Sequence, residues 1–310
     1  MRRYAVPMVL GAGILWGTMG VFVRSLEKMG FDSVQITALR LVCGAVMLWI
    51  VLAVTGRART GVKIRDMLLF AAMGIISLLC MSLLYFYTIT ASSLSVAAIL
   101  LYLSPVMVTL MAAVFLKEPL TGGKLLCLVL AVAGCALVSG VLGGEGIGLR
   151  SLLTGVGSSV AYGSYSIFGT FALKKHEPLV VTTWSFTFAA LGSVIVAGIP
   201  EMGYKIAACQ GYIWEFVGLV LATAFVTAAV PYLMYTTGLK YMPAAHAAIA
   251  ACIEPLTAAL CGLVFYSEGL GIPELVGIVM ILGAIVLLNT GVGRPASPGG
   301  RNSMDFPDGK

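Results

Sequence analysis

The stretch that decides the fold is Tyr85–Glu118, YFYTITASSLSVAAILLYLSPVMVTLMAAVFLKE, because it recurs as Tyr235–Glu268, YTTGLKYMPAAHAAIAACIEPLTAALCGLVFYSE. Nine of the 34 aligned positions are identical at a constant offset of 150 residues. They include the first tyrosine, a central proline and the closing glutamate. Two apolar stretches that merely share a composition would not match in the same order at tyrosine, proline and glutamate. We therefore infer that the chain contains two copies of one unit.

Weaker matches extend both copies. Matching residues stand 146 apart near the start of each copy and 149 apart near its end, a drift that short loop insertions explain. The pairs are Gly11 with Gly157, Trp16-Gly17 with Tyr162-Gly163, and Gly134 with Gly283. We therefore divide the chain into a first repeat, 1–143, a second repeat, 144–293, and a tail, 294–310, whose Gly, Pro, Ser and charge predict disorder.

The composition restricts the class of protein. The chain has 310 residues, of which 60% are hydrophobic and 10% charged, with a mean hydropathy of +1.02. An ordinary soluble domain carries about 25% charged residues. These values exclude a soluble enzyme and a disordered regulator. The seven cysteines form no C-x-x-C pair and mostly lie in apolar runs, which indicates buried thiols and no disulfide scaffold.

Apolar runs near the length that crosses ~30 Å of hydrocarbon recur ten times. Each is expected to be a helix, because an unpaired backbone is costly in lipid. The first run follows Arg2-Arg3 and has no cleavage site before its charged end, so we expect a mature helix and no signal peptide. The predicted spans are 4–23, 33–55, 67–89, 94–116, 125–143, 151–173, 178–200, 214–238, 244–266 and 275–293.

The basic residues predict the orientation. With the N-terminus in the cytoplasm, 14 Lys and Arg fall on cytoplasmic segments, 4 fall outside and Arg40 lies within a span, which accounts for all 19. This bias predicts a protein of the inner cell membrane with both termini cytoplasmic. The net charge of +6 is thereby explained by topology, so no nucleic-acid partner is expected.

Five helices are an odd number, so the second copy must enter the membrane upside down. The predicted fold is an all-α membrane protein whose ten transmembrane helices form two inverted five-helix repeats. Inverted repeats of this kind are typical of secondary transporters, in which the two halves surround a site near the midplane.

Short motifs recur in a fixed order over the two halves. They are Leu15-Trp16-Gly17, Arg40 in A-L-R, and Tyr85 through Pro105 to Glu118, then Ala161-Tyr162-Gly163, Glu254-Pro255 and Glu268. Through these motifs the chain resembles the EamA family of the drug/metabolite transporter superfamily over about residues 4–292. The resemblance implies ten helices, inverted repeats and transport of small metabolites, often export of amino acids or related compounds, and it leaves the substrate unspecified. One departure is Phe186, which stands where Arg40 would recur.

Glu254 is the most informative candidate, because an ionised carboxylate in the middle of a bilayer must face a cavity, find a partner or stay protonated. It is a candidate for substrate binding and for proton coupling, and the alternative is a neutral carboxyl bonded to a neighbouring helix. His246 precedes it by eight residues, which places both near one face of a continuous helix. His246 is therefore a second candidate for proton coupling, or a hydrated residue at the helix start.

Arg40 stands near the outer end of the second span. We predict a charge-pairing role for it. A contact with a substrate carboxylate and a position at the outer surface reached by snorkelling remain alternatives.

Pro105 and Pro255 interrupt matching helices, and each frees a carbonyl at membrane depth. Matching interruptions in two halves indicate a binding site, although a bend without ligand contact explains them as well. Aromatic side chains are candidate walls of the same site, with packing or interfacial anchoring as the alternative. These aromatic candidates are Trp16, Tyr85, Tyr102, Tyr162 and Trp184.

No motif supports enzyme chemistry. The sequence has neither a G-x-x-x-x-G-K-[ST] loop nor an H-E-x-x-H zinc motif, and it holds only two histidines, so we expect no cofactor and no metal. We predict a transporter of a small metabolite, embedded in the bilayer, with protons as a candidate coupling ion and the oligomeric state open, a monomer included. A lipid or lipid-linked-sugar translocator is the main alternative, and an intramembrane enzyme is a weaker one.

Overall fold

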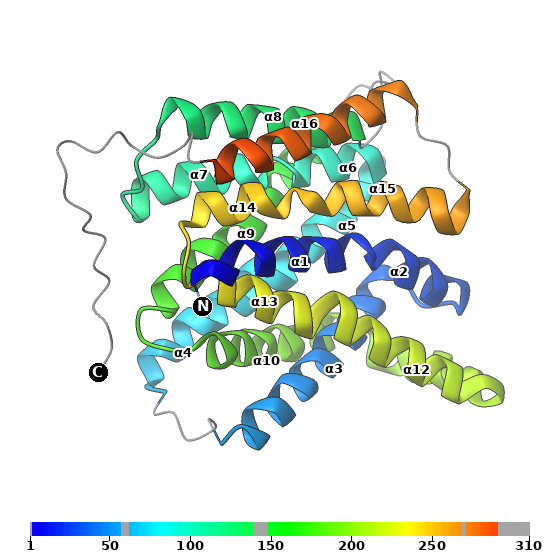
Figure 1. The fold of residues 1–310 in the computed structure, drawn as a ribbon. Coiled ribbons are helices and arrows are strands. Elements are labelled where there is room, and N and C mark those ends of the chain that lie inside the picture. The colour runs from blue at the N-terminus through cyan, green and yellow to red at the C-terminus, as the bar shows by residue number, and fades with distance from the viewer. Residues whose placement is uncertain (1, 57–61, 93, 139–147, 268–270, 291–310) are drawn as a thin grey trace.

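The computed structural model describes residues 2–56, 62–92, 94–138, 148–267 and 271–290, and these residues contain helices and turns but no strand. The helices run roughly along one axis, horizontal in Figure 1, and the start of the chain and the end of the last helix lie at the same end of the bundle. The predicted tail, 294–310, lies outside the described residues.

The helices of the first repeat are α1 (Ala5–Gly17), α2 (Met19–Lys28), α3 (Ser33–Val54), α4 (Ile64–Ala71), the π-helical η3 (Ala72–Cys80), α5 (Met81–Ala91), α6 (Leu94–Leu101), α7 (Ser104–Phe115) and α8 (Gly122–Val138). Those of the second repeat are α9 (Leu149–Ala172), α10 (Pro178–Val196), α11 (Ile199–Ala208), α12 (Ile213–Ala224), the π-helical η6 (Phe225–Ala229), α13 (Val230–Leu239), α14 (Ala244–Ala251), α15 (Ile253–Tyr266) and α16 (Ile272–Asn289). Short 3₁₀ turns cover Arg2–Tyr4 and Cys209–Tyr212.

Each of the ten predicted spans coincides with a helix or a run of consecutive helices in the described part of the chain. Seven of these runs are long and apolar enough to cross a membrane, and two shorter apolar helices are α8 and α16. The remaining one, α9, has 24 residues but is less apolar because serines and tyrosines interrupt its apolar side chains. The chain is therefore an all-helical, multi-pass membrane protein.

Some predicted boundaries were wrong. The seventh span, predicted as 178–200, ends at Val196, because Gly198 takes a left-handed conformation (φ 66°) and starts the separate helix α11. That helix carries Glu201 and Lys205 in its first and last turns, a charge pattern that suits a membrane surface better than its interior.

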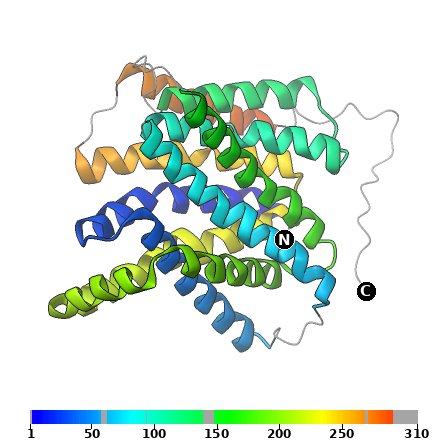
Figure 2. The ribbon, with the colours of Figure 1, turned by 180° about the vertical axis from the view of Figure 1, so that it is seen from behind.

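The packing repeats the internal symmetry of the sequence. The first helix of each repeat packs on a helix of the third span of the other repeat, α1 on α13 and α9 on α5. It also packs on a helix of the fourth span of the other repeat, α1 on α15 and α9 on α7. Figure 2 shows the pair α5 and α9 crossing the bundle side by side, in cyan and green. The second spans pair with each other as α3 with α10, and the fifth as α8 with α16. This exchange of partners is what two inverted copies produce.

Two glycines that match in the sequence sit at matching crossings. A Cβ built on Gly17 would lie 3.0 Å from the backbone nitrogen of Ala258 on α15, and one built on Gly163 would lie 3.4 Å from that of Val108 on α7. Residues 108 and 258 are themselves 150 apart. Small residues therefore let the first helix of each repeat approach its neighbour closely at both crossings.

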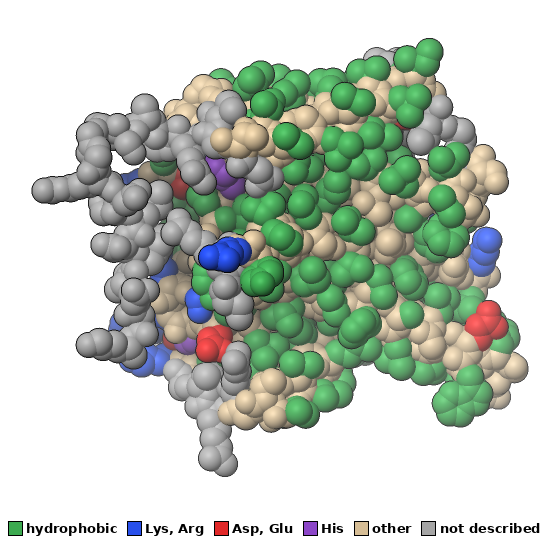
Figure 3. Space-filling model, viewed as in Figure 1, with side chains coloured by type: hydrophobic (Ala, Val, Ile, Leu, Met, Phe, Trp, Pro, Cys, Tyr) green, Lys and Arg blue, Asp and Glu red, His purple; other side chains and the backbone are tan. Residues whose placement is uncertain are grey.

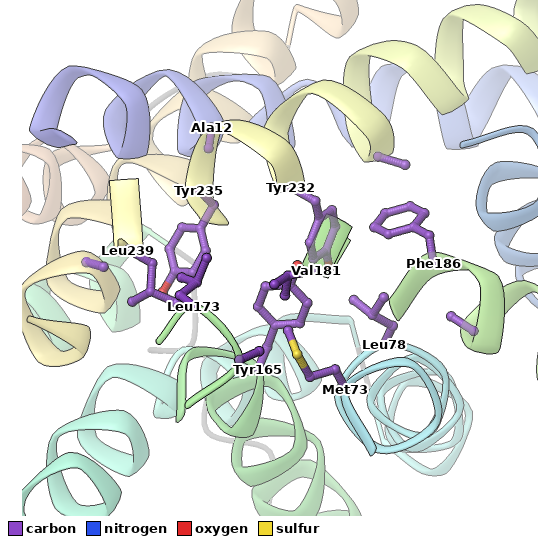
Figure 4. Packing of buried hydrophobic residues seen from close by; sticks show 14 of the residues in the cluster. Ala12, Met73, Leu78, Tyr165, Leu173, Val181, Phe186, Tyr232, Tyr235 and Leu239 are labelled. Atoms are coloured by element: carbon purple, nitrogen blue, oxygen red, sulfur yellow. The ribbon is translucent and has the colours of Figure 1, made fainter. Parts of the chain in front are cut away.

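The surface and the core suit a bilayer. Hydrophobic side chains form a broad band across the face in Figure 3, and charged side chains gather toward the two ends of the bundle. Inside, aromatic and aliphatic side chains from both repeats interlock. In Figure 4, Phe186 of α10 and Tyr232 of α13 lie side by side, with ring centroids 5.2 Å apart.

The proline-containing helices are broken where the sequence predicted an interruption. Tyr102 and Leu103 separate α6 from α7, and Cys252 separates α14 from α15. Positions 102 and 252 are again 150 apart. Each break precedes the proline by a few residues, because a proline fits the first turn of a new helix but not the middle of a continuous one.

Candidate functional site

A small cavity lies at the centre of the bundle, between helices of both repeats. The space open to the centre of a water molecule is ≈ 20 Å³, which is enough for about one water but far too small for a metabolite. A molecule much larger than water can therefore enter this cavity only if the surrounding helices move apart. The lining residues are Trp16, Ser104, Val108, Tyr162, Gly163, Tyr165, Ser166, Tyr232, Tyr235, Ala248 and Ala251.

Aromatic rings from three helices form one wall of the cavity. The indole of Trp16, at the end of α1, lies edge-on to Tyr232 of α13, with ring centroids 4.9 Å apart, and against Tyr235 at 5.4 Å. Tyr162 of α9 completes the group, 6.3 Å from Trp16. Edge-on arrangements of this kind are favourable and leave ring faces available for an apolar group.

Hydroxyl pairs join α9 to α13 beside this wall. The hydroxyls of Ser166 and Tyr235 are 2.7 Å apart, and those of Tyr165 and Thr236 are 2.9 Å apart. Figure 4 shows Tyr165 and Tyr235 on their facing helices. These buried polar groups satisfy one another, so the pairs stabilise the contact between the two helices.

Two buried donors at the site have no hydrogen-bond partner among the described residues. They are Nε1 of Trp16, whose side chain lines the cavity, and Nε of Arg40 on α3. Arg40 is 8% exposed, and its Nη1 donates to the sulfur of Met19, a weak acceptor. An unsatisfied buried donor costs ~1–3 kcal/mol, and a ligand that supplies an acceptor recovers that cost.

Glu254 lies in the first turn of α15, in the middle of the 23-residue span Ala244–Tyr266. The hydroxyl of Tyr162 donates to its Oε2 over 3.5 Å, which is long for such a bond. The charge of Arg40 attracts Glu254, but in the described structure the two side chains make no direct ion pair. The site therefore contains a carboxylate, a guanidinium and an indole N–H with unused bonding capacity.

The structure brings together several sequence candidates. Trp16 and Tyr162 line the cavity, and Glu254 contacts Tyr162. Pro105 follows the lining residue Ser104 in the first turn of α7, and Pro255 follows Glu254 in the matching turn of α15. Tyr85 and Tyr102 do not line the cavity, but both lie near enough to Glu254 to interact electrostatically with its carboxylate.

Trp184 and His246 do not reach the cavity. Trp184 of α10 packs edge-on against Trp49 of α3, with ring centroids 5.2 Å apart, so it belongs to the packing between those helices. The spacing argument for His246 assumed one continuous helix from 246 to 254. The break at Cys252 interrupts that helix, so the eight-residue spacing no longer places the two side chains on one face.

Sequence reasoning missed Tyr165, Ser166, Tyr232 and Tyr235 as lining residues. A usable signal existed. Tyr162, Tyr165 and Ser166 follow the i, i+3, i+4 pattern of one helix face. Tyr232 and Tyr235 are likewise three residues apart, and Tyr235 is the repeat mate of Tyr85. Among the described residues no three His, Cys, Asp or Glu side chains cluster as metal ligands.

Comparison with known proteins identifies relatives along nearly the whole chain. The model of the EamA-like transporter family matches twice, over residues 3–140 and 149–290. An uncharacterized transporter of Archaeoglobus fulgidus is 29% identical over 289 residues, which cover 92% of this chain and 96% of the relative. The uncharacterized inner membrane transporter YicL of Salmonella typhimurium is 25% identical over 301 residues, covering 93% and 95%.

Two further comparisons bear on function and fold. The threonine/homoserine exporter RhtA of Escherichia coli is 29% identical over 273 residues, which cover 86% of this chain and 85% of RhtA. A solved crystal structure with 16% sequence identity superimposes with a TM-score of 0.78 over 95% of this chain and all (100%) of the other, which supports the fold. Since the family model matches both halves, this chain belongs to the EamA-like transporter family.

Proposed function

We propose that this protein is a secondary active transporter of the inner membrane that exports small zwitterionic metabolites, amino acids or related compounds, by alternating access. The cavity between the repeats is the substrate site. Rocking of one repeat against the other exposes it to each side of the membrane in turn.

The observation that carries this proposal is the set of unused polar groups around the cavity. A zwitterion has a cationic amine, for which Glu254 is a partner, and a carboxylate, for which Arg40 Nε and Trp16 Nε1 are free donors. Its apolar part would rest against the rings of Tyr232 and Tyr235. The name of the relative RhtA, an exporter of threonine and homoserine, supports the same class of substrate.

Glu254 is also our candidate for proton coupling. A carboxyl group at mid-membrane takes up or releases a proton according to which side water reaches it, so its protonation can be tied to the direction in which the site opens. Bound substrate amine and bound proton would then compete for the same carboxylate.

The test is counterflow of labelled amino acids and related metabolites into proteoliposomes, with and without an imposed pH gradient. The wild-type protein is expected to show saturable exchange that the gradient alters. Glu254→Gln removes the proton site and the negative charge, so the half-saturating concentration should rise about tenfold and the response to the gradient should disappear. Glu201→Gln, on the exposed helix α11, is the matched control and should behave as wild type.

Other outcomes would contradict parts of the proposal. If Glu254→Gln keeps the wild-type response to the gradient, the coupling role is wrong. If no member of a broad panel exchanges while labelled lipids are scrambled between leaflets, the substrate class is wrong and a lipid translocator is favoured.

A further inference from the structure

A charged contact joins the two repeats at the end of the bundle that we assign to the cytoplasm. Glu118, just after α7, accepts a hydrogen bond at Oε1 from the backbone N–H of Ala244, the first residue of α14, over 2.8 Å. Its Oε2 accepts from Nζ of Lys124 on α8, over 3.3 Å. Glu118 and Lys124 belong to the first repeat and Ala244 to the second, so the carboxylate bridges the two halves.

This contact has the features of a strong interaction. The side chains of Lys124 and Glu118 are only 3% and 14% exposed. Lys124 also donates to the carbonyl of Pro119 over 3.1 Å. A carboxylate at a helix N-terminus satisfies a free N–H and interacts favourably with the helix dipole.

The backbone fixes the glutamate in place. Lys117 has a left-handed conformation (φ 55°), and the N–H of Glu118 bonds back to the carbonyl of Ala112, which closes the end of α7. Within the described chain, the other non-glycine residue with a positive φ is Ser267, at 55°. Residues 117 and 267 are 150 apart, so this costly geometry recurs at the matching position of the second repeat.

The contact lies beside the substrate pathway. Ala248 and Ala251 line the cavity, and they follow Ala244 along the same helix, α14. Tyr235, which also lines the cavity, lies close enough to Glu118 to interact electrostatically with its carboxylate. If the cytoplasmic ends of the halves separate, α14 must move away from α7, and the bond between Glu118 and Ala244 must break.

We propose that Glu118 is a latch that holds the cytoplasmic side of the pathway closed by docking on the N-terminus of α14, with Lys124 as its counter-ion. The latch rests on the proposed transport function, because it presupposes a pathway that opens to the cytoplasm. Weakening it should raise the population of the form that is open to that side.

The test measures opening directly and needs no substrate. Ala248→Cys is introduced into a chain that retains Cys127 and has its other cysteines replaced by alanine. Inside-out membrane vesicles are then treated with a membrane-impermeant maleimide, and labelling at each position is quantified by mass spectrometry. Cys127 of α8 is fully buried in a hydrophobic cluster that includes residues of α14 and α16, so its labelling reports unfolding.

Glu118→Leu removes both acceptor oxygens, so the labelling rate at position 248 should rise about fivefold, with no change at Cys127. Lys240→Gln, an exposed charge change at the same end of the bundle, is the control and should leave the rate unchanged. An unchanged rate with Glu118→Leu overturns the latch.

The exchange of charges, Glu118→Lys with Lys124→Glu, separates a latch from a local ion pair. It keeps the buried pair but puts a lysine, which cannot accept a hydrogen bond, in the position facing Ala244. The latch proposal expects labelling to stay fast in this variant, whereas a return to the wild-type rate overturns it. Because labelling needs no transported compound, a wrong substrate class would leave these results intact.

Discussion

Two tryptophans in this protein differ in whether the indole N–H has a hydrogen-bond partner. The indole N–H of Trp49 donates to the hydroxyl of Thr187 over 2.9 Å and so joins α3 to α10. The indole N–H of Trp16 has no such partner in the described structure, although the ring is almost fully buried. A satisfied donor contributes to stability, whereas we propose that the unsatisfied donor of Trp16 beside the cavity binds the substrate.

Trp16→Phe should therefore weaken substrate binding with little loss of stability. The substituted ring keeps most of its aromatic contacts but loses the N–H, and a hydrogen bond to a charged group contributes about 1.5–3 kcal/mol. The half-saturating concentration in counterflow is expected to rise about tenfold or more. Trp49→Phe is the matched control, and it should lower the thermal stability of the purified protein while leaving that concentration unchanged. The reverse pattern would show that Trp16 is a packing residue.

At the scale of elements, close helix crossings depend on single glycines. Gly17 lies where α1 meets α15, and a Cβ there would come within 2.5 Å of the Thr257 side chain and 2.6 Å of the Glu254 carbonyl oxygen. Backbone atoms cannot turn away as the end of a side chain can. The position of Glu254 relative to Trp16 therefore depends on residue 17 being a glycine, which has no side chain.

Gly17→Ala is expected to push α1 and α15 apart. Overpacking of this kind costs about 1–3 kcal/mol, so the midpoint of thermal unfolding in detergent should fall by several degrees, and exchange should fall with it. Gly20→Ala is a close control, because a Cβ at Gly20 meets nothing within 4 Å. Equal melting temperatures for the two variants would contradict the tight crossing.

The sequence predicted elements better than it predicted the site. Apolar length located every described span, because the bilayer requires long hydrophobic helices and tolerates little else. It missed α11, since a surface helix needs no apolar run. The site was harder to predict, because the contact between Trp16 and Tyr232 depends on how α1 crosses α13, and no local sequence pattern specifies that crossing. The role predicted for His246 relied on its spacing from Glu254 along one helix, and the break at Cys252 removes that argument because it changes the face on which later residues lie.

At the scale of the whole molecule, helices of one repeat pack on the matching helices of the other repeat. The two ends of the bundle, which face opposite sides of the membrane, are therefore built in nearly the same way. The sequence breaks that equivalence at the centre, where Ser104 matches Glu254 and Phe186 takes the place of a second Arg40. The site that we propose therefore contains one carboxylate and one guanidinium, where two exact copies of the repeat would supply two of each.

The predicted orientation can be checked on the intact protein. A green fluorescent protein fused after Lys310 should fluoresce, because that domain folds in the cytoplasm, and an alkaline phosphatase fused at the same place should be inactive. The physical reason is the excess of Lys and Arg at that end of the bundle, 14 against 4 in the sequence. An active phosphatase would mean that the chain is inserted the other way, and Glu118 would then close the outer side.

The polar character of α9 has a consequence for how the protein is made. Its hydroxyls find partners on helices of both repeats, Ser77 of η3 for Ser164 and Tyr235 of α13 for Ser166. During synthesis α9 emerges well before α13, so for a time part of its polar face lacks the groups that later satisfy it. A helix of this kind enters lipid poorly on its own. We therefore expect that, during biogenesis, α9 is held by the helices already inserted, or by the insertion machinery, until α13 is inserted and completes the bundle.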